Sequence, residues 1–213
     1  MASRIFVTAT DTDAGKTWVT ASVIRSLLSE GKRAKALKPI ACGMDIASRN
    51  EDIDALLSAQ NLSDADQISL YRYALPASPS QAAAAEDQVV DTDKLVQWCE
   101  AQSTDVDICL IEGVGGLMVP ITNNWLVSDW IDATPDAEIW LVVGCKLGAI
   151  NQTLLSLEKL KQMGRSPARI FFNATKPEFN DWIEPTRKAV EPFLNQDCTI
   201  HCLEFEDAVL LTD

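Results

Sequence analysis

The sequence predicts an α/β protein with three layers, in which a mainly parallel β-sheet is flanked by helices on both faces. Two features indicate this class. Short apolar runs alternate along the chain with longer segments whose apolar residues recur at helical spacing, the pattern of strand–helix–strand units. Several runs are apolar almost throughout, which is typical of parallel strands buried on both faces. The 213 residues suit one domain, which we expect to span residues 1–213.

Each element follows from its local pattern. The first helix is expected where Val19, Val23 and Leu27 recur at helical spacing, before Gly31 ends the helix. Pro39 ends the second strand. We expect strands at residues 4–8, 34–38, 106–111, 139–143 and 169–172. We expect helices at residues 17–30, 52–60, 92–102, 149–163 and 181–194, a helical turn at 81–86, and a loop at 71–79.

Composition and charge narrow the functional classes. The net charge of −13, without a cluster of Lys and Arg, disfavours a nucleic-acid partner. No uninterrupted apolar run approaches the ~18 residues of a membrane span, and the first residues lack the pattern of a secretory signal. We therefore expect a cytoplasmic protein without a membrane partner.

The segment at residues 8–17 reads TATDTDAGKT and lies between the first strand and the first helix. It is similar to the phosphate loop G-x-x-x-x-G-K-[ST], except that Thr10 stands at the position of the first glycine. Gly-Lys-Thr can also be an ordinary helix start. The position after a strand favours an anion site, because a helix N-terminus offers free N–H groups and a partial positive charge. Lys16 would add a full charge near phosphates, and Thr17 a hydroxyl for magnesium.

Two further polar side chains follow predicted strands. Lys38 follows the second strand in LKPIACG, and Glu112 follows the third in IEGVGG. Lys38 could be a solvated strand end, and Glu112 could cap a turn. However, ligands of parallel sheets bind at the carboxyl ends of the strands, where these residues are expected to meet the loop. A lysine and a carboxylate there suit phosphoryl transfer, with the carboxylate on magnesium and the lysine on the transferred group.

Six segments, taken in order, resemble the dethiobiotin synthetases, enzymes of the biotin pathway with a P-loop NTPase-like fold. They read FVTATDTDAGKT, KPIACG, RNEDIDAL, IEGVGGLMVPI, LVVGCKLGAINQTLLS and FFNAT, and the matches run from Phe6 to Asn173. That family also lacks a glycine at the position of Thr10. The resemblance therefore identifies residues 8–17 as a variant phosphate loop.

The resemblance implies an ATP- and Mg²⁺-dependent ligase acting on 7,8-diaminononanoate and CO₂. One amine takes up CO₂ as a carbamate, ATP phosphorylates the carbamate, and the second amine closes a cyclic urea. Lys16, Lys38 and Thr12 would act around the carbamate and the γ-phosphate. Such a reaction depends mostly on positioning and charge neutralisation, so a catalytic His or Cys is not needed.

The resemblance also implies three sets of contacts. The nucleotide would contact Asp13, Ala14, Gly15, Lys16, Thr17, Trp18, Glu112, Gly115 and, at the adenine, Asn173. Magnesium would be held by Thr17, Asp52 and Glu112, with Asp54 as the alternative to Asp52. The diamine would contact Thr12, Lys38 and Cys42, and its carboxylate tail the backbone N–H groups of Gly148, Ala149, Ile150 and Asn151. In the family this last segment reaches across a homodimer interface, so a homodimer is expected.

The chain departs from the family's usual residues at Ala9, Asp13, Cys42 and Gln152, where Gly, Glu, Ser and His are common. Two other functions stay open. A ParA- or MinD-like switch ATPase would share the sheet and a variant loop, but such proteins usually carry an additional early lysine that residues 8–14 lack. A catalytically silent nucleotide-binding paralogue would have no need for both lysines and the carboxylate.

Overall fold

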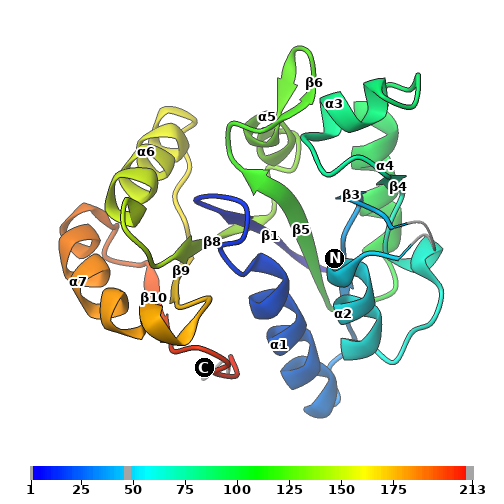
Figure 1. Ribbon diagram of the computed structural model, residues 1–213. Coiled ribbons are helices and arrows are strands. Elements are labelled where there is room, and N and C mark those ends of the chain that lie inside the picture. The colour runs from blue at the N-terminus through cyan, green and yellow to red at the C-terminus, as the bar shows by residue number, and fades with distance from the viewer. Residues whose placement is uncertain (1, 46–48, 210–213) are drawn as a thin grey trace.

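The computed structural model describes residues 2–45 and 49–209. At its centre is a six-stranded sheet in the order β10-β9-β8-β1-β5-β2, in which every neighbouring pair is parallel (Figure 1). Its strands are β1 (Ser3–Ala9), β2 (Ala34–Leu37), β5 (Ile108–Gly116), β8 (Glu138–Gly144), β9 (Arg169–Asn173) and β10 (Thr199–Leu203). The predicted parallel sheet is confirmed.

Helices and two small sheets surround the central sheet. The α-helices are α1 (Lys16–Ser29), α2 (Glu51–Ala59), α3 (Pro79–Ala84), α4 (Thr92–Gln102), α5 (Val127–Asp132), α6 (Ala149–Gln162) and α7 (Asn180–Val190). Short 3₁₀ helices cover Ala65–Gln67, Pro177–Phe179 and Glu191–Phe193. Strand β3 (Ile40–Cys42) pairs in parallel with β4 (Tyr71–Tyr73), and β6 (Pro120–Thr122) pairs antiparallel with β7 (Trp125–Leu126). Among the described residues, no helix has both the length and the apolar character that a membrane crossing requires.

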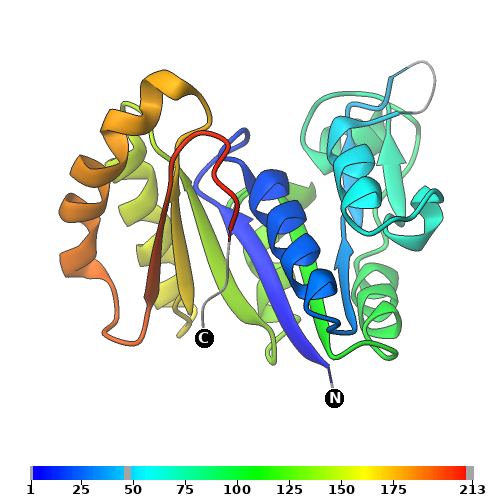
Figure 2. The same ribbon diagram turned by 90° about the horizontal axis from the view of Figure 1, so that it is seen from below.

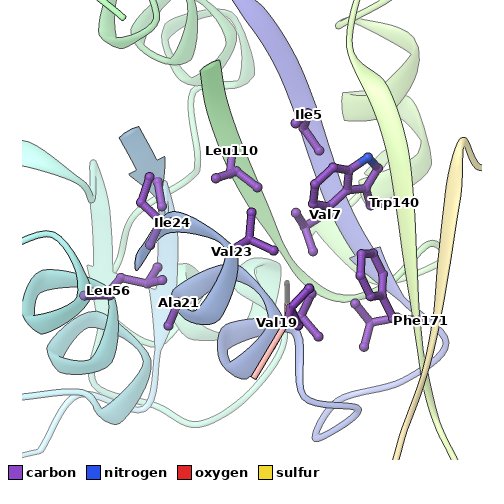
Figure 3. Packing of buried hydrophobic residues seen from close by; sticks show 14 of the residues in the cluster. Ile5, Val7, Val19, Ala21, Val23, Ile24, Leu56, Leu110, Trp140 and Phe171 are labelled. Carbon is purple, nitrogen blue, oxygen red and sulfur yellow. The ribbon is translucent and has the colours of Figure 1, made fainter. Parts of the chain in front are cut away.

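The core has two faces because side chains alternate along each strand. On one face, Val19 and Val23 of α1 pack toward Val7 and Leu110 of the sheet (Figure 3), and α2 extends this cluster. On the other face, Phe6 meets Trp130 of α5 edge to face at 5.0 Å between ring centroids. Helices α4 and α5 cover this second face near β5, and α6 and α7 cover it near β8 and β9. The predicted three layers are confirmed.

The structure corrects several sequence-based boundaries. The expected loop at 71–79 is wrong at its start, because Tyr71–Tyr73 forms β4 before the two prolines of the segment. The elements β3, β6, β7 and α5 were not expected, since segments of two to six residues show no measurable periodicity. Strand β10 was also not expected, because this edge strand mixes polar and apolar residues. Strand β5 runs from Ile108 to Gly116, so Glu112 lies inside it and not after it as expected.

The topology brings the ends of β1, β5 and β2 together, since these strands are neighbours in the sheet. After β10, the chain returns to α1, as Figure 2 shows. There Trp18 Nε1 donates to the main-chain oxygen of Asp207 at 2.9 Å, and Ser22 Oγ accepts from the N–H of Val209 at 2.7 Å. The end of the described chain therefore packs against the first half of α1.

Candidate active site

The loop between β1 and α1 has the backbone of an anion site. Gly15 precedes α1 with φ 93°, and no side chain caps the N–H groups of the first turn. Thr10 N–H donates to Val142 O at 3.0 Å, which fixes the start of the loop to β8. Asn173 Nδ2 donates to Ala14 O at 3.0 Å and fixes its end. The free N–H groups at the tip of α1 are thus held facing outward, where they can bind phosphate.

Gly15 should not tolerate a side chain. A Cβ there would lie 2.1 Å from Asn173 Nδ2, and its φ of 93° is left-handed. We expect Gly15→Ala to lower the free energy of unfolding by about 1–3 kcal/mol and to weaken ATP binding about tenfold or more. Gly31→Ala is the matched control, because Gly31 is also left-handed but a Cβ there meets no atom within 4 Å. If both variants bound ATP as the wild type does, the loop backbone would not be the anion site.

Lys38 and Glu112 meet because of the strand register. Leu37 of β2 lies opposite Ile111 of β5, so the next residues on each strand are neighbours. Lys38 Nζ donates to Glu112 Oε1 at 2.6 Å, and both side chains are almost fully buried. This ion pair forms the floor of the site between β1, β5 and β2.

Asp52 comes from the first turn of α2. Asn50 caps this helix: its side chain accepts from the N–H groups of Asp52 and Ile53, and its Nδ2 donates to Cys42 O at 3.1 Å. Asp52 Oδ2 accepts from Lys38 Nζ at 2.8 Å. Asp54 lies elsewhere, 3.6 Å from Arg49 at the surface. The structure therefore brings Asp52, and not Asp54, to Lys38.

Thr17 joins the two carboxylates. Its Oγ1 lies 2.7 Å from Asp52 Oδ1 and 2.7 Å from Glu112 Oε1, and its single proton can be donated to only one of them at a time. Glu112 Oε2 is buried and has no hydrogen-bond partner among the described residues. A hydroxyl, two carboxylates and one unsatisfied buried oxygen fit a magnesium ion, which takes few protein oxygens and keeps several waters.

The two lysines have opposite electrostatic environments. Burial opposes the charge on Lys38, but attraction to Glu112 and Asp52 more than offsets this and raises its pKa. Burial lowers the pKa of Lys16 to about 8, and repulsion by Lys38 adds to the shift. Lys16 Nζ contacts the main-chain oxygen of Asp11, at 3.5 Å. A buried cation destabilised in this way favours an anionic ligand.

Lys16, Thr17, Lys38 and Asp52 border one cleft of about 590 Å³, whereas Glu112 is fully buried and is not part of the lining. Its lining includes ten of the residues predicted from the sequence, which are Thr12, Asp13, Gly15, Lys16, Thr17, Trp18, Lys38, Cys42, Asp52 and Gly115. Burial raises the pKa of the Cys42 thiol to about 11, so this side chain stays protonated near neutral pH. Other lining residues were not expected from the sequence: Pro76, Ala77, Ser78, Val114, Val119 and Thr175. Val114, Val119 and Thr175 lie within the segments quoted above but were not singled out, and no motif marks residues 76–78.

Some predicted residues do not line the cleft. Ala14 and Asn173 are buried behind the loop. The segment Gly148, Ala149, Ile150 and Asn151 lies at the start of α6, where Gly148 has φ 92° and no side chain caps the helix. This N-terminus has the backbone of an anion site, but in one copy of the chain it does not border the cleft.

Comparison with known proteins shows the family of the chain. The sequence pattern of the AAA domain family matches residues 3–199. The ATP-dependent dethiobiotin synthetase of Acidiphilium cryptum is 37% identical over 182 residues, which cover 82% of this chain and 81% of that protein. The enzyme of Legionella pneumophila with the same name is 42% identical, over 74% of each chain. The chain belongs to the dethiobiotin synthetase family. The resemblance seen in the sequence is thereby confirmed, and the dethiobiotin synthetase relatives span most of the chain.

More distant solved structures agree with the fold. The septum site-determining protein MinD of Pyrococcus horikoshii has a TM-score of 0.56 at 16% identity, covering 97% of this chain and 82% of that one. The signal recognition particle receptor FtsY of Elizabethkingia anophelis has a TM-score of 0.53 at 17% identity, and the match spans 63% of its length. At such identities the likeness shows that this chain shares the fold of these two proteins, and it shows nothing about the activity of this chain.

Proposed function

We propose that this protein is an ATP-dependent dethiobiotin synthetase that closes a cyclic urea from 7,8-diaminononanoate and CO₂. The observation that carries the proposal is the cleft itself, in which Lys16 and Lys38 lie beside the uncapped tip of α1. Two anions, a carbamate and the triphosphate of ATP, must meet for the reaction to occur. The repulsion between them is the main barrier, and fixed positive groups in a buried site lower it.

The chemistry proceeds in two displacements. A carbamate oxygen attacks the γ-phosphorus of ATP, the bond to the β-phosphate oxygen breaks, and ADP leaves. The second amine then attacks the carbonyl carbon, loses a proton, and displaces inorganic phosphate as the ring closes. Lys16 and the N–H groups of α1 would hold the phosphates, while Lys38 and Thr12 would orient the carbamate. The protein supplies positioning and charge, with no covalent intermediate on a side chain.

Magnesium would be held by Thr17, Asp52 and Glu112. When bound, it would neutralise charge on the phosphates and help to orient them. The unsatisfied buried Oε2 of Glu112 supports this assignment. The adenine would lie at the other end of the cleft, near Thr175 and Trp18, which both line it. Asn173 reaches the phosphate loop through Ala14, and its contact with the base stays a prediction.

The carboxylate tail of the diamine would bind the start of α6 in a second copy of the chain. Gly148 and Asn151 do not border the cleft of their own chain, so a homodimer is needed to supply them. Exposed apolar side chains on and before α6 support an interface here, with Leu147 83% and Leu155 63% exposed. Half of the residues that line the neighbouring groove of about 440 Å³ also belong to α6.

Leu155→Glu tests the homodimer. Burying a new charge at an apolar interface is costly, so we expect the variant to be monomeric by light scattering. It should bind ATP about as well as the wild type but lose most diamine-dependent turnover, because each cleft would lack the carboxylate-binding segment. A control, Lys188→Glu, changes an exposed residue of α7. A variant that stayed dimeric, or a monomer with full turnover, would contradict the proposed arrangement.

Phosphate release from ATP is the decisive assay for the function. We expect release only when the diamine and bicarbonate are both present, together with mass-spectrometric detection of the cyclic urea. Running ATP, GTP and CTP in parallel gives the nucleotide preference. ATP turnover that does not depend on the diamine and is stimulated by a protein partner would indicate the switch ATPase instead. Nucleotide binding without any turnover would select the silent paralogue.

A further inference from the structure

A charged cluster lies on the far side of the phosphate loop from the cleft. Asp11 belongs to the loop but does not line the cleft. Its Oδ2 accepts from Gln152 Nε2 at 2.9 Å and from Lys146 Nζ at 3.4 Å. Its Oδ1 accepts from the N–H of Thr12 at 2.8 Å. A single carboxylate therefore connects the loop with the segment that joins β8 to α6.

The contacts of Asp11 continue into the site. The side chain of Asp11 accepts from the N–H of Thr12. The main-chain oxygen of Asp11 lies 3.5 Å from Lys16 Nζ. Thr12 and Lys16 both line the cleft. Any rotation of the Asp11 side chain would release the Thr12 N–H, and any shift of its backbone would remove the oxygen beside Lys16. The orientation of two cleft residues thus depends on a residue behind them.

Lys146 and Gln152 are themselves held in place. Gln152 lies in the first turn of α6, where its N–H donates to Gly148 O and its main-chain oxygen accepts from Ser156 Oγ. Lys146 lies in the connection after β8, and its oxygen accepts from the N–H of Ala149. Burial tends to raise the pKa of Asp11, but the hydrogen bonds from Gln152, Thr12 and Lys146 lower it. Asp11 is therefore a carboxylate that its donors keep ionised.

We propose that Gln152 and Lys146 are positioning residues of the phosphate loop, which act through Asp11 to fix Thr12 and Lys16 in the cleft. The part of this proposal that concerns the diamine rests on the proposed function. Residues 148–151, proposed to bind the diamine's carboxylate, lie between the two positioning residues in sequence. Binding of a carboxylate there would act on the same short segment that holds the loop. Asp11 then links the loop of one copy to the tail site that the same copy provides for the cleft of its partner.

Gln152→Glu is the sharpest single change, because it keeps the shape and places a carboxylate against Asp11. Two like charges at hydrogen-bond distance cannot both stay ionised without cost. We expect ATP binding, measured by calorimetry, to weaken about 10- to 100-fold. Combining Asp11→Asn with Gln152→Glu reverses donor and acceptor across the same contact, and should bring ATP affinity back to within about threefold of the wild type.

Gln162→Glu is the control for added charge, since Gln162 lies exposed in the last turn of the same helix. It should bind ATP like the wild type. Wild-type affinity in Gln152→Glu overturns the proposal, and so does a double variant that remains as weak as the single one. If Gln152→Glu does not fold, Lys146→Met provides the measurement. It should weaken ATP binding about 3- to 10-fold, and no change there also overturns the proposal.

The readout separates this proposal from the proposed function. ATP binding can be measured without the diamine, whereas the synthetase assay requires it. If the wild type bound ATP but showed no diamine-dependent turnover, the proposed function would be wrong and the positioning role would still stand. If the function holds, Gln152→Glu should also lower kcat, since Thr12 and Lys16 would be displaced during turnover. A purely structural role would lower thermal stability without the rescue by the paired change.

Discussion

Lys38→Ala should lower diamine-dependent ATP turnover by about 10²–10³-fold. The lysine is buried, keeps its charge because Glu112 and Asp52 raise its pKa, and borders the cleft. An ammonium fixed in this way stabilises the charge of the transferred phosphoryl group without reorganisation. ATP binding should change less than turnover, because Lys16 and the tip of α1 still hold the phosphates. Steady-state phosphate release gives kcat, and calorimetry gives the ATP affinity.

The same variant should be less stable, in a way that identifies the metal site. Removing Lys38 leaves Glu112 buried beside Asp52 without its cation, and breaking a buried ion pair of this type costs about 3–5 kcal/mol. We expect magnesium to restore part of the melting temperature of Lys38→Ala, because a divalent cation would replace the lost charge. Lys94→Ala, at an exposed position of α4, serves as the control. Unchanged turnover would remove Lys38 from the mechanism.

The main groups of the site could be predicted because they lie toward the carboxyl ends of parallel strands or in the segments that follow. The residues Lys16, Lys38 and Glu112 come from three separate segments, yet a parallel sheet brings the carboxyl ends of its strands to one edge. Register then sets the distances: Leu37 opposite Ile111 makes Lys38 and Glu112 neighbours. Strand identity and a parallel topology predict the shared edge, while strand order and register decide that Lys38 meets Glu112.

Other parts depend on contacts that a sequence does not reveal. The sequence favoured Asp52 over Asp54 as a metal ligand, but only the structure shows that Asp52 contacts Thr17 and Lys38. The contact between Asp11 and Gln152 joins residues 141 positions apart. Edge strand β10 was not recognised because its burial is uneven. In each case the deciding interaction is tertiary, so local propensity and periodicity carry no information about it.

Glu112→Gln should separate metal binding from the integrity of the site. The substitution keeps the volume and an acceptor oxygen for Thr17 or Lys38, and Lys38 retains its ion pair with Asp52. The loss of stability should therefore be smaller than in Lys38→Ala. One of the two carboxylates is nevertheless gone from a site with two buried lysines. A divalent cation would then lose one of the two carboxylates that contact Thr17, while Lys16 and Lys38 remain.

We therefore expect Glu112→Gln to reduce magnesium-dependent turnover by about 10²-fold or more and to abolish the stabilisation by magnesium that we expect for the wild type in thermal unfolding. Asp52→Asn should act in the same direction. Asp54→Asn should leave both measurements within about twofold of the wild type, since Asp54 contacts Arg49 at the surface. Manganese binding, followed by electron paramagnetic resonance, gives a readout independent of turnover. Equal metal affinity in Glu112→Gln and the wild type would exclude Glu112 as a ligand, and its burial beside Lys38 would then serve only to hold that lysine in the cleft.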